Sequence, residues 1–312
     1  MNGRNKAEIV AVILAITGNV FWGFSNMLIK VAMSVADSWI VLALRFDMAL
    51  LLLTIPVLLG RQKLHFGGRK FKLLLILALL EPVYYFFESF AIKYTNVTYA
   101  SVVQALTPVT AAIAAAIVLS EIPTRKQAFF ALFPVVGILL MVLSGNRLGI
   151  VDGFGIFLLA GICITSAVLR SFNRSAAPYF SAYERTYAMM LASCLVFNFR
   201  ALMLVNFDLG AFLSPLGNPV FLVPVVLLVI FCSIGSSIMV NFAASRLSVM
   251  ELASYSSICT IVSMFSGIVF LHEPLTLQSF IGTVLVLIGL RGMNKAAAEA
   301  YTLSAADNNT GL

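Results

Sequence analysis

Two glutamates interrupt a long apolar stretch of the chain, LLLILALLEPVYYFFESFAI. Glu81, Tyr84, Tyr85 and Glu88 are spaced so that all four share one face if the segment is helical. At a rise of about 1.5 Å per residue, the two carboxylates are about 10.5 Å apart along the helix axis. Two aromatic rings lie between them. This surface suits an ammonium group or another organic cation, through charge attraction and cation–π contact.

Pro82 directly follows the first of these glutamates. A proline has no N–H, so it cannot donate to the carbonyl of Ala78 one turn earlier. In a membrane, such a freed carbonyl is tolerated where it lines a cavity or finds another partner. The proline therefore adds a polar backbone group to the acidic, aromatic surface.

The composition indicates what kind of element positions these residues. The chain of 312 residues is 61% hydrophobic and 11% charged, whereas a soluble domain carries about 25% charged residues. So little charge cannot cover a water-facing surface, which predicts an integral membrane protein. The net charge of +7 comes mainly from residues between the apolar segments, so we expect no nucleic-acid partner.

A helix that crosses a bilayer needs roughly 20 residues, and the chain offers ten candidate apolar segments. They are approximately residues 9–33, 38–59, 72–92, 97–119, 127–144, 152–170, 182–204, 222–244, 249–271 and 277–291. The sequence thus predicts an all-α integral membrane protein with ten transmembrane helices. We interpret the first segment as a retained helix and not as a cleaved signal peptide.

The distribution of lysine and arginine predicts the orientation. With the N-terminus inside, fifteen basic residues fall on the inner side and five on the outer side. The positive-inside rule then places both termini in the cytoplasm of a multi-pass protein of the cytoplasmic (inner) membrane. Residues 296–312 are small and polar, and we expect them to form a disordered cytoplasmic tail.

The chain contains an internal repeat. A constant offset of 152 residues superposes EIPT at Glu121 on EPLT at Glu273, and Gly137 on Gly289. The halves are therefore residues 1–145 and 146–295, with five spans each. Because five is odd, the second half starts on the other side of the membrane, as in the inverted repeats of secondary transporters. For Glu121 and Glu273, at helix ends, we favour a capping or loop-fixing role over a role in transport.

Several motifs carry a family resemblance over nearly the whole chain: NVFWGFSNMLIK, ALRFDMALLLL, LTPVTAAIAAAIVLSEIPT and its later echo IVFLHEPLT. Their order and double occurrence resemble the drug/metabolite transporter superfamily, specifically EamA-type proteins with two five-helix repeats. The resemblance implies movement of small metabolites, mostly outward, without ATP. The second copy departs from the pattern at Thr260, where the first has Pro108.

The candidate site lies where the two halves should meet near the midplane. The repeat offset places Ser233 and Ser237 opposite Glu81 and Tyr85, so a pocket between them would be asymmetric. Residues of the first, fourth and ninth spans complete the candidate substrate-binding set, which is Glu81, Tyr84, Tyr85, Glu88, Trp22, Asn19, Gln104, Ser233, Ser237 and Tyr255.

The sequence thus predicts a secondary transporter that exports a small polar metabolite, such as an amino acid or an amine, by alternating access. Glu81 and Glu88 are the expected ammonium ligands, and protons are the coupling ion if either glutamate changes protonation. We expect no cofactor and no metal, because the cysteines and histidines lack ligand spacing. The alternatives are a membrane-embedded lipid-modifying enzyme and a channel, and the oligomeric state stays open.

The same residues also allow structural interpretations. The glutamates could form ion pairs with Arg45, Lys93 or Arg170 within the protein. The tyrosines and Trp22 could be packing aromatics, and the small residues of the eighth span could permit close helix contact. The sequence alone does not distinguish these structural roles from substrate binding, because the distinction depends on which side chains are in contact in the folded protein.

Overall fold

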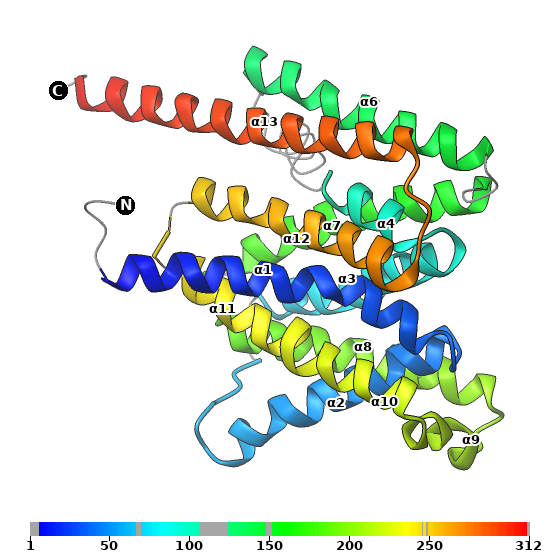
Figure 1. Ribbon diagram of the computed structural model, residues 1–312. Helices are drawn as coiled ribbons and strands as arrows, with labels where there is room; N and C mark the ends of the chain where they lie inside the picture. Colours follow the sequence, from blue (N-terminus) through cyan, green and yellow to red (C-terminus); the bar gives the residue numbers. More distant parts are fainter. Residues whose placement is uncertain are drawn as a thin grey trace.

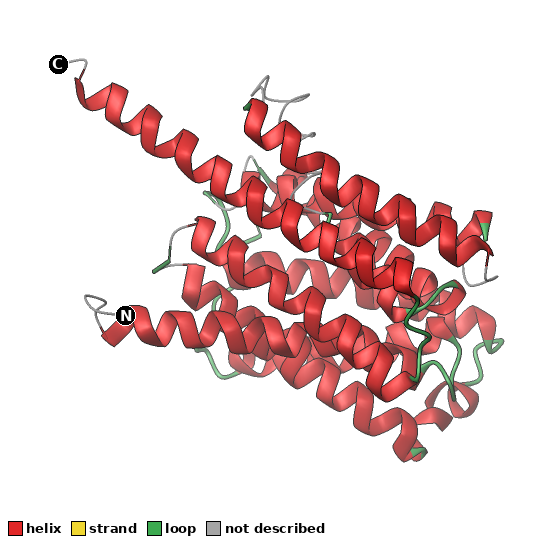
Figure 2. Ribbon diagram, turned by 45° about the horizontal axis from the view of Figure 1, so that its top comes forward, coloured by secondary structure: helices red, strands yellow, loops and turns green. Residues whose placement is uncertain are grey.

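The computed structural model describes residues 6–66, 70–106, 124–147, 152–176, 178–244, 246–247 and 249–310. Within these ranges the regular structure is entirely helical, and the long helices run side by side as one bundle (Figures 1 and 2). The first and last of them, α1 and α13, carry the two chain ends at the same end of the bundle (Figure 1). This end is called the terminal end below, and the other the distal end.

The helices of the first half agree with the predicted spans. They are α1 (Lys6–Ala32), α2 (Ser38–Leu58), α3 (Phe71–Tyr94), α4 (Val97–Gln104) and α6 (Arg125–Arg147). Only the start of the fourth predicted span is described, as α4. Pro108 and Glu121 lie outside the described residues, so the structure does not test the expectations for these two positions.

The second half repeats this order with one irregular span. Its helices are α7 (Gly153–Ala176), α8 (Ala182–Leu204), α9 (Leu209–Leu213), the 3₁₀ turn η1 (Ser214–Gly217), α10 (Pro219–Leu227), the π-helix η2 (Leu228–Gly235), α11 (Ser236–Ala244), α12 (Val249–Leu271) and α13 (Leu277–Thr310). The eighth predicted span is therefore three successive helical segments, with a π-helical stretch at its middle.

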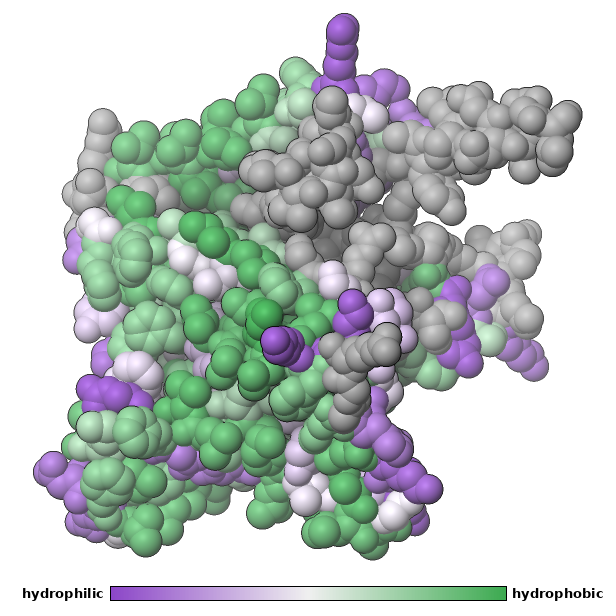
Figure 3. Space-filling model, turned by 180° about the vertical axis from the view of Figure 1, so that it is seen from behind, coloured by the Kyte–Doolittle hydropathy of each residue, from purple (hydrophilic) through white to green (hydrophobic). Residues whose placement is uncertain are grey.

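The surface of the bundle is apolar along its length. Six of the described helices are long and apolar enough to cross a membrane, and two shorter apolar stretches, Gly153–Leu169 and Ile258–Leu271, accompany them. Large apolar side chains such as Leu51, Leu58 and Leu277 are mostly exposed. Figure 3 shows a broad hydrophobic face with hydrophilic residues gathered mainly toward its two ends. This is the surface expected of a protein whose sides contact lipid.

The two halves exchange their first helices. α1 packs mainly against α12 and α11 of the second half, whereas α7 packs against α3 and α4 of the first. Under the 152-residue offset these are equivalent contacts, and α2 with α8 and α6 with α13 form self-equivalent pairs. A pseudo-two-fold relation between the halves produces this pattern. Because the halves interlock, residues from both of them line the interior.

Helices α6 and α13 meet through two glycines. A Cβ added at Gly137 would come within 2.4 Å of the Gly282 carbonyl oxygen, and one added at Gly282 within 2.5 Å of the Gly137 oxygen. The backbones therefore touch directly, as small residues permit in membrane helices. α13 then projects past the other helices at the terminal end (Figures 1 and 2).

This projection differs from the predicted disordered tail. α13 continues as a helix to Thr310, and the Lys126 ammonium pairs with the Glu299 carboxylate at 2.7 Å. The physical reason is local. The segment begins with the run KAAAEA, and alanine, lysine and glutamate have high helix propensity, so low hydrophobicity alone does not end the helix.

Both halves carry a backbone irregularity at equivalent positions. Pro82 lies inside α3, and the offset places it opposite Ile234 in η2. Proline removes a helix hydrogen bond, and π-helical turns shift the hydrogen-bond register and occur frequently at functional sites. Interrupted helices at matching positions of two inverted halves are the best pointer to a transporter binding site.

Candidate functional site

Arg45 of α2 lies inside the bundle next to both irregular segments. It is 1% exposed, and its Cζ is 4.5 Å from the centroid of the Tyr85 ring. Its Nη2 is 3.3 Å from Ser233 Oγ and 3.4 Å from the Tyr85 hydroxyl. The arginine thus connects α2 with the proline-containing α3 and with the π-helix η2. These contacts fix the orientation of the guanidinium.

Glu88 of α3 lies on the same interior surface and is buried. Its Oε1 accepts hydrogen bonds from the Tyr84 hydroxyl at 2.9 Å and from Gln104 Nε2 at 2.7 Å. Its Oε2 is buried and has no hydrogen-bond partner among the described residues. The carboxylate is therefore held by one oxygen while the other remains available.

Glu81 completes the charged cluster. It is buried two turns before Glu88 and interacts electrostatically with Arg45 and Glu88. Among the described residues, no ion pair within 4.0 Å joins the Arg45 guanidinium to either carboxylate. Arg45, Glu81 and Glu88 are thus close enough to feel one another's charge without being closed into a direct pair.

A polar network extends from Glu88 to the other helices through Asn26 of α1. Asn26 Nδ2 lies 3.1 Å from Ser101 Oγ, 3.3 Å from Gln104 Oε1 and 3.3 Å from Ser263 Oγ. The amide therefore joins α1 to α4 and α12. Because Gln104 also donates to Glu88, the network is continuous from the charged cluster to the interface between the halves.

Six of the ten candidate residues meet in this cluster: Glu81, Tyr84, Tyr85, Glu88, Gln104 and Ser233. The remaining four do not join it directly. Asn19 donates to a carbonyl of its own helix at 2.8 Å, and Ser237 donates to the Ser233 carbonyl at 2.6 Å. Trp22 is 40% exposed, and Tyr255 packs against a separate apolar cluster that contains Ala11.

The structure adds Arg45, Asn26 and Ser263 to the candidate set. Two of them had a signal in the sequence. Arg45 is a charged residue within an apolar span, which is a functional hypothesis by default. Asn26 is seven residues after Asn19 on one face of α1. Ser263 had no such signal, since a serine in a membrane helix also serves close packing.

The structure distinguishes among the three basic residues that could form ion pairs with Glu81 and Glu88. Lys93 pairs with Asp37 instead, with 3.7 Å between Nζ and Oδ2. The side chain of Arg170 lies outside the described residues. Arg45 is the predicted partner that does share their surroundings, although it forms no direct ion pair with them.

A cavity of about 580 Å³ opens at the distal end of the bundle. Its lining includes Lys30 of α1, Lys93 and Asn96 near the α3–α4 turn, and Glu273 of the α12–α13 loop. Lys30 is one helical turn beyond Asn26, so the two side chains share a face of α1. The polar network therefore leads from the charged cluster toward this cavity.

Glu273 closes the wall of the distal cavity by capping α4. Its Oε1 accepts from the Val97 N–H at 2.6 Å, and its Oε2 accepts from the Thr98 N–H at 2.9 Å and the Thr98 hydroxyl at 2.8 Å. Gly267 leaves room for the carboxylate, since a Cβ there would lie 2.7 Å from Oε2. The capping role predicted for Glu273 is confirmed, and Glu121 lies outside the described residues.

We expect Glu273→Ala to lower the melting temperature of the detergent-solubilised protein. The buried N–H groups of Val97 and Thr98 would lose their acceptor, at a cost of about 1–3 kcal/mol per group. Asp208→Ala is the matched control, because Asp208 caps α9 through Gly210 and Ala211 where all three residues are exposed. Equal shifts for the two variants would contradict the buried cap.

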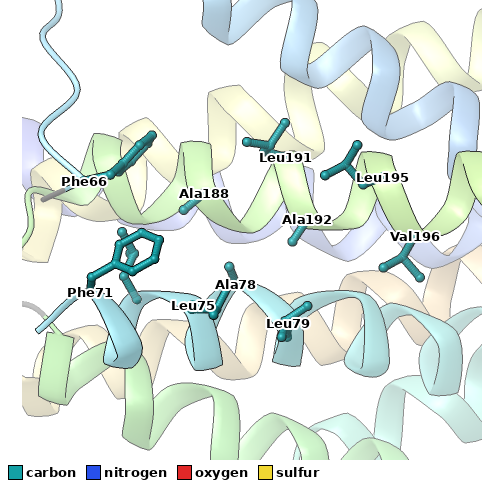
Figure 4. A pocket seen from close by; sticks show the side chains of 11 residues that line it. Phe66, Phe71, Leu75, Ala78, Leu79, Ala188, Leu191, Ala192, Leu195 and Val196 are labelled. Carbon is teal, nitrogen blue, oxygen red and sulfur yellow. The ribbon is translucent and has the colours of Figure 1, made fainter.

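A second cavity, of about 270 Å³, lies between α3 and α8. Figure 4 shows apolar side chains of both helices turned toward this space. Its lining consists of Phe66, Phe71, Leu74, Leu75, Ala78, Leu79, Ala188, Leu191, Ala192, Leu195 and Val196. None of these side chains carries a charge or a hydrogen-bonding group, so the cavity suits an apolar group better than the polar part of a metabolite.

Comparison with known proteins identifies the family of the chain. The EamA-like transporter family matches residues 9–143 and, a second time, residues 153–295. This chain belongs to the EamA-like transporter family. The two EamA matches confirm the predicted all-helical membrane fold built from two repeats. They also make the chain a membrane transporter and not an enzyme.

Two relatives of this EamA protein are similar along almost their whole length. Uncharacterized transporter YcxC of Bacillus subtilis (strain 168) is 31% identical over 290 residues, covering 91% of this chain and 92% of the relative. An uncharacterized transporter of Archaeoglobus fulgidus is 27% identical over 281 residues, covering 89% and 96%. A solved crystal structure matches 93% of this chain and 98% of its own with a TM-score of 0.58 and 16% identity, which supports the fold alone.

Proposed function

We propose that this EamA protein is a secondary-active transporter that exports a small metabolite bearing an ammonium group, of the amino-acid or amine type. The observation that carries the proposal is the buried Glu88 carboxylate. One of its oxygens is held by Tyr84 and Gln104, and the other has no partner among the described residues. Glu81 adds a second negative charge, and Tyr84 and Tyr85 add aromatic rings for cation–π contact.

Transport by alternating access would use the two interrupted helical segments as bending points. Pro82 in α3 and η2 in the eighth span lie beside the charged cluster, at equivalent positions of the two halves. Bending at these points would let the halves rock around a fixed site. The distal cavity and the Asn26 network supply a polar route toward that end. Basic residues favour a cytoplasmic terminal end, so the route would lead outward.

Protons are the proposed coupling ion. The cluster contains two carboxylates and one guanidinium, so protonation of one carboxylate makes it neutral. Glu81 is the candidate for this step because it makes no hydrogen bond within the described ranges, whereas Glu88 is held by Tyr84 and Gln104. A proton bound at Glu81 would then alternate with the loading of substrate at Glu88.

Counterflow in liposomes tests the proposal. The purified protein is reconstituted with unlabelled compound inside, and uptake of the labelled compound is measured for neutral amino acids, polyamines, quaternary amines, citrate and glucose. We expect counterflow for compounds with an ammonium group, and none for citrate or glucose. Acceleration by substrate on the far side also distinguishes a carrier from a channel.

Two results would contradict the proposal. Counterflow restricted to compounds without an ammonium group would remove Glu88 as the ligand. Flux that ignores substrate on the far side would indicate a channel. An imposed pH gradient in the same liposomes tests the coupling ion, because it should drive accumulation against the substrate gradient only if protons are coupled.

A further inference from the structure

Arg45 has hydrogen-bonding atoms that the protein does not use. Its Nη2 contacts Ser233 and Tyr85, but Nε and Nη1 are buried and have no partner among the described residues. A buried donor left without an acceptor carries the full cost of its lost hydration. An unsatisfied buried group requires an explanation in a folded protein, and a ligand that binds at another stage of the functional cycle is one such explanation.

The guanidinium is also held in place. It lies over the Tyr85 ring at 4.5 Å and near the Phe46 ring at 5.4 Å, while Ser233 accepts from Nη2. These contacts come from α2, α3 and η2, so the group cannot easily turn away toward solvent. A preorganised arginine is well suited to bind a carboxylate through one or two parallel N–H bonds.

The unused atoms of Arg45 have a counterpart on Glu88. Both groups are buried, both interact electrostatically, and no ion pair within 4.0 Å closes the gap between them in the described part of the chain. Nε and Nη1 of Arg45 need an acceptor, and Oε2 of Glu88 needs a donor. A ligand that carries one carboxylate and one ammonium group satisfies both needs at once.

We infer that Arg45 binds the carboxylate of the transported molecule while Glu88 binds its ammonium group, so that the substrate is a zwitterion of the amino-acid type. This inference rests on the proposed function and narrows it, because an amine without a carboxylate would satisfy Glu88 and leave Arg45 without its acceptor. Arg45 is therefore a substrate ligand and the residue that determines specificity for amino acids over amines.

Pairs of compounds that differ only in the carboxylate test this inference. They are leucine with isopentylamine, phenylalanine with phenethylamine, and lysine with cadaverine. In wild-type liposomes we expect at least about tenfold faster counterflow for one or more of the amino acids than for its paired amine, which corresponds to about 1.4 kcal/mol. Equal or faster counterflow of every amine would overturn the inference while leaving the proposed function in place.

Arg45→Gln provides the second measurement. We expect uptake of the preferred amino acid to fall at least tenfold, whereas uptake of its paired amine changes less than threefold. Arg200→Gln is the control, since Arg200 is exposed, lies over the Trp39 ring and forms no ion pair within 4.0 Å in the described part of the chain. An equal loss for both compounds at an unchanged melting temperature would assign Arg45 a structural role and overturn the inference.

Arg45→Lys keeps the proposal testable if the glutamine variant does not fold. Lysine retains the charge but presents a single ammonium in place of the guanidinium fork. We expect a partial loss of preference for the amino acid over the amine, and an unchanged preference would contradict the assignment. Absence of counterflow for all six compounds in the wild-type protein would instead count against the proposed function itself.

Discussion

Replacing Glu88 by glutamine is expected to reduce counterflow of the wild-type substrate by at least about tenfold at concentrations below saturation. Glutamine has nearly the same shape and keeps an acceptor oxygen for the Tyr84 and Gln104 donors, so the helix packing should survive. The variant lacks the negative charge that would bind an ammonium group. Hydrogen bonds to charged groups contribute about 1.5–3 kcal/mol, and each 1.4 kcal/mol is a factor of about ten.

The measurement is the initial rate of counterflow by purified protein, with the melting temperature recorded for the same preparation. Glu8→Gln is the control. Glu8 is a half-buried glutamate in the first turn of α1, distant in sequence from the residues of the cluster. We expect the control to transport at the wild-type rate. A Glu88→Gln protein with full counterflow would show that the carboxylate is not a ligand, and the site would have to be assigned elsewhere.

Replacing Asn26 by alanine is the second change with a large expected effect. Asn26 is the residue through which α1 reaches Ser101 and Gln104 of α4 and Ser263 of α12. Its loss leaves the buried hydroxyls of Ser101 and Ser263 and the half-buried amide of Gln104 with one partner fewer. Buried groups that lose a partner cost about 1–3 kcal/mol, so we expect counterflow to fall roughly tenfold.

Asn19→Ala is a close control for this change. Asn19 is on the same helix and is buried to the same extent, with 4% exposure for each asparagine. Its amide donates only to the Ala15 carbonyl of its own helix. We expect a small effect on counterflow, within about twofold, because no contact between helices is lost. Equal losses for the two variants would mean that α1 needs both amides for folding and that the Asn26 network has no special role in transport.

The helical spans could be predicted from the sequence because the lipid environment strongly restricts the structures that a chain can adopt. Every backbone polar group in lipid must be satisfied within the protein, so long apolar segments have to be helices. The boundaries of α2, α8 and α12 accordingly agree closely with the predicted spans. The tail is the exception. Beyond the bilayer its alanine-rich composition favours a helix, whereas the prediction weighed only its polarity.

The repeat could also be predicted from the sequence alone, since superposing the halves requires only a constant offset between similar segments. How the two halves pack against each other could not be predicted in this way. Exchange of α1 and α7 between the halves is a property of the tertiary contacts, and it explains why Asn26 of the first span meets Ser263 of the ninth. No pattern within either span indicates which partner its polar face contacts.

The candidate site was predicted in part. Helical spacing places Glu81, Tyr84, Tyr85 and Glu88 on one face, and this is a property of the chain itself. Whether a neighbouring cation neutralises these carboxylates depends on distances between helices, which spacing along one helix cannot determine. The sequence offered Arg45, Lys93 and Arg170 as equivalent partners. The fold separates Lys93 from the cluster and brings Arg45 into it.

By itself, then, the sequence determined the class of protein, its helical spans, its internal repeat and one acidic, aromatic helix face. These follow from hydrophobicity, periodicity and self-similarity, which are all local or one-dimensional properties. Only the tertiary structure decided that a buried guanidinium lies beside the two carboxylates without closing an ion pair with them. That depends on how α2, α3 and η2 approach one another, and a few ångströms there separate an internal salt bridge from a site for a zwitterion.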